Sequence, residues 1–138
     1  MIHHFGSKEN LLKAVLDEFD ARAVARVTGS ELAQALLDDA EYTMAHKGLA
    51  TLHTVLQAEH LARDDEITHR FRARNRALRG HFAAVLGEAA AVELIAFIEG
   101  ALTVWLLDPE TTDLRAMYAR YLARLQNGET GPDPAPSG

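Results

Sequence analysis

The sequence has no cysteine and only four prolines, and both scarcities narrow what the chain can be. Without cysteine it can form neither a disulfide framework nor a thiolate metal site. The prolines stand at Pro109 and in the last residues, so no helix breaker interrupts the long stretch before Pro109. Apolar and β-branched residues do not alternate with polar ones, which leaves no convincing strand. The sequence therefore predicts an all-α fold.

Positively charged residues are also few, because the sequence has 14 Lys and Arg against 20 Asp and Glu, which gives a net charge of −6. An acidic chain is repelled by nucleic acid unless its basic groups are clustered, so most of it should not touch DNA. No basic start is followed by an apolar run, as a secretion signal requires. The most apolar stretch, residues 89–107, contains Glu93 and Glu99. Each carboxylate would cost about 2.5–3.5 kcal/mol at the centre of a bilayer. We therefore expect a buried helix in a cytoplasmic protein without membrane contact.

The sequence is rich instead in Ala, Leu, Glu and Arg, which favour helices. Ser7 is a suitable N-cap for a first helix, and Asp64 or Asp65 for a later one, because these side chains accept hydrogen bonds from free amides in the first turn. Apolar stripes at helical spacing predict six helices, over residues 8–26, 30–46, 49–62, 65–87, 90–107 and 112–126. The tail, residues 127–138, is rich in Gly and Pro and should be disordered.

The fifth predicted helix has more apolar surface than one small bundle can cover. We expect a six-helix bundle whose last two helices form the interface of a homodimer. The alternative is a central helix in the core of a single chain. The residues expected at the interface are apolar or aromatic positions of these two helices: Ile98, Leu102, Leu106, Tyr118, Tyr121, Leu122 and Leu125.

Two short segments resemble transcriptional regulators of the TetR type. His4-Phe5, Gly6-Ser7-Lys8 and Leu11-Leu12 are similar to the end of the recognition helix and the turn after it. An apolar helix with Glu99-Gly100, ending in Trp-Leu-Leu-Asp-Pro at Pro109, is similar to the C-terminal part of the family. The resemblance covers about residues 2–126. It implies a remnant of the recognition helix at 1–6 and an effector-binding and dimerisation domain at 7–126, followed by the tail.

The resemblance also implies that Lys8 and His4 contact DNA phosphates in a full-length form. Ile2 stands where the family has a tyrosine, and the supporting helices and most base-reading positions are not in the sequence. One lysine neutralises one phosphate, which is far too little for useful affinity at physiological salt. We therefore expect operator binding only from a full-length form with an intact helix-turn-helix.

In the family, the helices before the last pair enclose an effector pocket. The residues expected to line it here are His53, Gln57, His60, Phe71, Arg74, Asn75 and Trp105. Arg74 falls within an apolar row, where a charge is costly unless it is paired. It would pair with Glu59 or Glu99, or else with a carboxylate on the effector. The neighbouring arginines, which spread round the helix, are expected to be solvated.

His53 and His60 are separated by two helical turns, about 10 Å, which is too far for two ligands of one metal ion. Buried histidines with satisfied hydrogen bonds are the alternative to a pocket. There is no Gly-rich phosphate loop and no acid–base pair at a useful spacing, so we expect neither an enzyme nor a cofactor. The preferred interpretation is a ligand-responsive regulator, in this family most often a repressor. The alternatives are a helical-bundle metal- or cofactor-binding protein and a plain protein-interaction module.

Overall fold

A computed structural model describes residues 32–127, which form five helices and no strand. The helices are α2 (Leu32–Ala45), α3 (Lys47–His60), α4 (Glu66–Leu86), α5 (Glu88–Leu107) and α6 (Leu114–Gln126). The predicted all-α fold and the last five predicted helices are confirmed to within a few residues at each end. The first predicted helix, the remnant with His4 and Lys8, and residues 128–138 lie outside the described residues.

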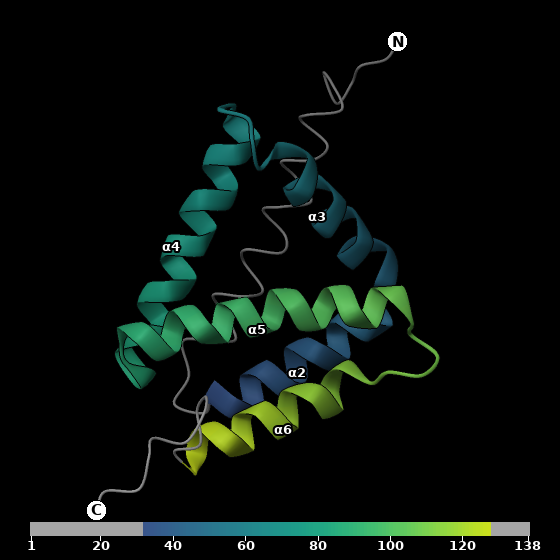
Figure 1. The fold of residues 1–138 in the computed structure, drawn as a ribbon, viewed down its shortest axis with the longest axis vertical. Coiled ribbons are helices and arrows are strands. Elements are labelled where there is room, and N and C mark those ends of the chain that lie inside the picture. Colours follow the sequence, from purple (N-terminus) through teal and green to yellow (C-terminus); the bar gives the residue numbers. More distant parts are fainter. Residues whose placement is uncertain (1–31, 128–138) are drawn as a thin grey trace, which may run out of the picture.

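The helices are arranged as a triangle above a pair (Figure 1). α3, α4 and α5 form the three sides of the triangle, and α2 and α6 lie side by side along the outer side of α5. The most extensive packing joins α4 to α5 and α2 to α6, while α3 makes smaller contacts with α2, α4 and α5. α3 is therefore the side of the triangle that the rest of the described fold holds least firmly.

The helix ends follow from local chemistry. The carboxylate of Asp65 caps α4 by accepting from the Thr68 amide at 2.8 Å, which confirms the predicted cap. Asp113 caps α6 by accepting from the Ala116 amide at 3.0 Å. Gly87 alone connects α4 to α5, with φ of 90°, a conformation that L side chains rarely adopt. This single residue fixes the corner between the two longest helices.

The apolar core is divided into two clusters. The larger one joins α2, α5 and α6 with the C-terminal half of α4 and one residue of α3. Its buried members are Leu32, Leu36, Ala40, Ala50, Phe82, Ala91, Leu94, Ala101, Trp105, Leu114, Tyr118 and Leu122. The smaller one fills the corner between α3 and α4 with Leu56, Ile67 and Phe71, against which Leu52 packs. Polar side chains of α3, α4 and α5 lie between the clusters, so the interior of the triangle is not a continuous apolar core.

α5 is apolar on a side that the described chain does not cover. Its four buried residues are Ala91, Leu94, Ala101 and Trp105. Val92, Val104 and Leu107 are 43%, 49% and 80% exposed. Within residues 32–127, α5 is therefore buried on one side only. By length and composition alone α5 could also cross a membrane, and 22% of its most apolar stretch is buried.

The residues predicted for the dimer interface are buried or partly buried within the described chain. Tyr118 and Leu122 are 4% and 7% exposed there. The other five are partly buried and pack against the same core: Ile98, Leu102, Leu106, Tyr121 and Leu125. The reason is that α6 has one apolar stripe, and packing against α2 and α5 uses it.

Candidate ligand-binding site

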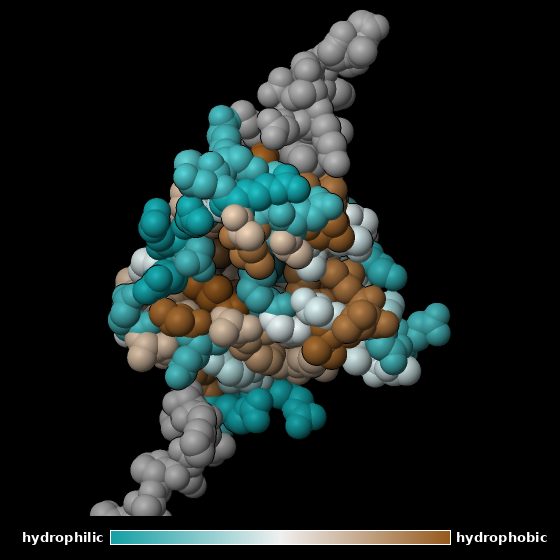
Figure 2. All heavy atoms as spheres, turned by 45° about the horizontal axis from the view of Figure 1, so that its top comes forward, coloured by the Kyte–Doolittle hydropathy of each residue, from teal (hydrophilic) through white to brown (hydrophobic). Residues whose placement is uncertain are grey.

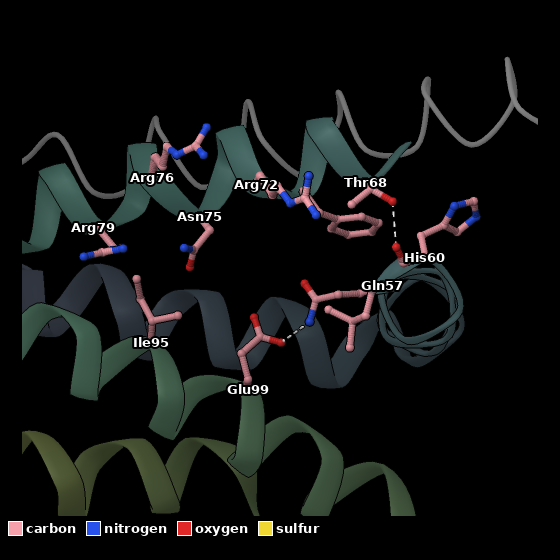
Figure 3. A pocket seen from close by; sticks show the side chains of 11 residues that line it. Gln57, His60, Thr68, Arg72, Asn75, Arg76, Arg79, Ile95 and Glu99 are labelled. Atoms are coloured by element: carbon pink, nitrogen blue, oxygen red, sulfur yellow. Dashed lines mark hydrogen bonds between the residues drawn. The ribbon is translucent and has the colours of Figure 1, made fainter. Parts of the chain in front are cut away.

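A cavity of about 370 Å³ lies between α3, α4 and α5 (Figure 3). Its lining residues come from both core clusters and from the polar side chains between them: Gln57, His60, Leu61, Thr68, Phe71, Arg72, Asn75, Arg76, Arg79, Ile95 and Glu99. The volume is within the range of small-molecule sites, about 300–1,000 Å³. On the face that Figure 2 brings forward, hydrophobic side chains surround a hollow near the centre, and hydrophilic ones gather above it.

Two side chains, one from α3 and one from α5, form the floor of the cavity and are joined by a hydrogen bond. The Gln57 amide nitrogen Nε2 donates to Oε1 of Glu99 over 2.9 Å, and both side chains are drawn at the bottom of the gap in Figure 3. Phe71 and Ile95 supply apolar surface on either side of this pair. The floor thus combines one carboxylate, one amide and apolar walls, which is a composition typical of a binding site.

The α4 wall carries the positive charge. Arg72, Asn75, Arg76 and Arg79 are spaced along one face of the helix. In Figure 3 Asn75 and Arg79 point from α4 toward α5, while Arg76 turns outward at the rim. The expectation that these arginines are solvated agrees with the exposure of the Arg72 and Arg79 side chains, 48% and 41%, and the structure adds that both also line the cavity. Their row reads as a solvated face because a polar cavity wall and a solvated surface share the same residue types.

His60 holds the corner between α3 and α4. Its ring nitrogen Nδ1 lies 2.9 Å from Oδ2 of Asp65, and the Thr68 hydroxyl donates to the His60 carbonyl oxygen over 2.6 Å. The backbone hydrogen bond from Thr68, with side-chain hydrogen bonds from Thr68 and His60, lowers the pKa of Asp65 to about 2. The His60 ring points away from the cavity in Figure 3. His60 therefore shapes the cavity edge and does not direct its ring at a guest.

A smaller cavity of about 50 Å³ lies on the other side of Glu99. His53 and Arg74 line it together with Asp39 and Tyr118. Burial, and secondarily the charge of Arg74, lowers the pKa of His53 to about 3, so this imidazole is neutral at physiological pH. Burial also raises the pKa of Tyr118, and the carboxylates of Asp39 and Glu99 act in the same direction. Arg74, Asp39 and Glu99 thus line one cavity inside the bundle, and Glu99 is one of the two partners that the sequence suggested for Arg74.

The predicted pocket residues divide among three places. Gln57, His60, Phe71 and Asn75 line the larger cavity, and His53 and Arg74 line the smaller one. Trp105 lines neither of them, since it is 3% exposed within the larger core cluster. It lies on the side of α5 that faces that cluster. The lining residues that the sequence did not single out for the pocket are Leu61, Thr68, Arg72, Arg76, Arg79, Ile95 and Glu99.

Within residues 32–127, no three His, Asp or Glu side chains gather closely enough to hold a metal ion. The rings of His53 and His60 have different surroundings. His53 packs edge-on against Phe71, with ring centroids 5.3 Å apart, and His60 faces Asp65.

Comparisons with known proteins leave the site to be interpreted from its own geometry. No family model matches the chain. No curated protein and no solved structure matches it either.

Proposed function

We propose that this chain is the ligand-sensing and dimerising core of a transcriptional regulator of the TetR type. The observation that carries the proposal is the cavity of about 370 Å³ between two separate core clusters. A pocket of this size with apolar walls and a few polar groups directed into it is the usual form of a small-molecule site. The sequence resemblance at both ends of residues 2–126 supplies the family.

The position of the cavity supports a mechanism by population shift. A guest would contact α3, α4 and α5 at once, and the Gln57–Glu99 hydrogen bond lies directly beneath it. A ligand shifts a conformational equilibrium only by its different affinities for the two arrangements. Since α3 makes the smaller contacts, its position against α5 is the feature that a guest can most readily change. In a repressor with an intact helix-turn-helix, this change would reach the DNA-reading unit and release the operator.

The uncovered side of α5 supports the homodimer. Val92, Val104 and Leu107 project from it, and Gly100 and Ala96 between them leave room for a second helix to approach closely. A two-fold axis brings the same face of two chains together, so an apolar face complements itself. We place the interface on this side of α5 and not on the buried side of α6.

The test of the regulatory function starts from the gene. The in-frame codons upstream of Met1 should encode the missing part of a helix-turn-helix, and the protein read from them should protect a two-fold-related site in DNA near its own gene. The half-sites should be one helical turn, or a multiple of it, apart. The chain of 138 residues serves as the control, and it should protect no site at physiological salt. Upstream codons without helix-turn-helix character, or a longer protein that protects no DNA, would remove the regulator from consideration.

A further inference from the structure

The walls of the larger cavity differ in charge, and this difference specifies the chemistry of its guest. We propose that the cavity receives an amphipathic organic anion, with its carboxylate, sulfonate or phosphate group against the arginines of α4 and its apolar body on Phe71 and Ile95. The proposal deepens the sensor function and rests on it for the premise that the cavity binds a small molecule. It adds the class of the ligand and its orientation.

The charge balance of the lining favours an anion. Three arginines line the cavity, and Glu99 is the single carboxylate among the lining residues. One oxygen of that carboxylate already accepts from Gln57. The net charge of the lining is thus positive in a chain whose overall net charge is −6. A positive wall in an acidic protein attracts anions to this place and to few others.

Two of the arginines have capacity left for a ligand. Arg79 is held by Glu88 at 3.0 Å. Arg72 has only Asp64, at 3.7 Å, which is too long for a good hydrogen bond, and Arg76 has no acid partner within residues 32–127. A guanidinium presents its N–H groups as a planar fork that matches the two oxygens of an acid group. We therefore expect Arg72 to be the main partner of the acid group of the ligand. Arg76 lies one helical turn further along α4, at the rim, and its charge also attracts this group.

The remaining surfaces set the orientation of the guest. Phe71 belongs to the smaller core cluster, and Ile95 packs against the larger one, so the apolar body bridges the two. Glu99 repels a second acid group at the floor and accepts a hydrogen bond from any N–H or O–H placed there. The acid end therefore lies toward α4, and the end that reaches α5 is neutral or a hydrogen-bond donor.

Two fluorescent probes with the same apolar body separate charge from hydrophobicity. Anilinonaphthalene sulfonate carries an acid group, and phenylnaphthylamine lacks it. Arg72→Gln should weaken binding of the sulfonate about five- to tenfold and change binding of the neutral probe less than twofold, because one charge-assisted hydrogen bond is lost. Glu99→Gln should act in the opposite direction and strengthen only the sulfonate. Added salt should weaken the sulfonate alone.

Three control variants test whether the two probes bind in the cavity. Arg120→Gln removes an arginine from an exposed position of α6 and should leave both affinities unchanged. Ile95→Trp fills the cavity and should reduce the binding of both probes. Val104→Ser removes apolar surface from the exposed side of α5, and it should alter neither affinity if both probes sit in the cavity.

The outcomes separate this inference from the function beneath it. If Arg72→Gln weakens both probes equally, or Arg120→Gln weakens the sulfonate as much as Arg72→Gln does, the anionic ligand is wrong while the cavity remains a binding site. If Ile95→Trp displaces neither probe, the cavity does not bind small molecules. The sensor function then loses its support together with the ligand class.

Discussion

At the scale of single residues, His53 links the polar interior to the stability of the fold. Burial lowers its pKa from 6.5 to about 3, with the charge of Arg74 adding to the effect. The unfolded chain therefore takes up a proton near pH 6.5 that the folded chain refuses until about pH 3. Because the unfolded state binds more protons in this window, stability is present at neutral pH and is lost as the pH falls.

We predict that this one group lowers the free energy of unfolding by about 2 kcal/mol between pH 7 and pH 5. The measurement is urea unfolding at pH 7, 6 and 5 for the natural chain and for His53→Gln, which has no group to titrate. The variant should show a shallower fall with decreasing pH, whatever its stability at pH 7. Parallel falls in the two proteins would mean that the pKa of His53 is the same in the folded and the unfolded chain.

At the scale of helices, the corner at Gly87 is the connection most sensitive to substitution. Its φ of 90° and ψ of 163° lie in a region that is almost restricted to glycine. Gly87→Ala should therefore destabilise the fold by about 1–3 kcal/mol, although no atom lies within 4 Å of the new Cβ. The cost is conformational, and urea unfolding measures it directly.

Gly80→Ala is the control for that prediction. Gly80 lies within α4, has no positive φ, and also has open space around its Cβ position. Alanine should stabilise this helix by about 0.5–1 kcal/mol. If the two substitutions change the free energy of unfolding in opposite directions, the backbone conformation determines the effect, because neither glycine has a crowded Cβ position. A neutral Gly87→Ala would mean that the corner relaxes into another conformation.

Most of the helix boundaries could be predicted, because caps and breaks are local. Asp65 begins α4, Gly87 ends it, and α5 ends shortly before Pro109, as the residue types indicate. The stripes also show which side of each helix faces inward. They do not show what it meets there, since that depends on segments distant in the sequence, such as α3 and α5 at the Gln57–Glu99 bond.

What the sequence missed at the candidate site has one physical origin. A polar cavity wall and a face in solvent share their composition, so the exposed arginines of α4 were not predicted to line a cavity as well. Trp105 shows the converse, because an aromatic side chain serves equally well in a core or in a pocket. Arg74 stood out because its charge interrupts an apolar row, and it does face a cavity. Charge within an apolar row is thus the more informative signal.

At the scale of the whole molecule, one apolar side of α5 stays exposed to solvent among the helices of residues 32–127. A contiguous apolar face on a protein marks a contact with another protein or a membrane. Here the face is one helix wide, contains Gly100 and Ala96 between its larger side chains, and lies opposite the side that packs on α6. These features suit a second copy of the same helix better than lipid, because Glu93 is exposed on the same helix.

We therefore predict that the chain sediments at twice its mass of 15.1 kDa and that Val104→Lys dissociates it. The lysine would place like charges opposite each other across the two-fold axis. It should raise the dissociation constant at least a hundredfold, equivalent to about 2.8 kcal/mol.

Val55→Lys is the matched control, because Val55 is 47% exposed on α3 and Val104 is 49% exposed on α5. The control should remain a dimer. A natural chain that stays monomeric at high concentration, or that sediments with lipid vesicles, would contradict the dimer, since the face would then be open to solvent or covered by lipid. If Val104→Lys and Val55→Lys dissociate the dimer equally, the interface lies elsewhere and α5 has a different partner.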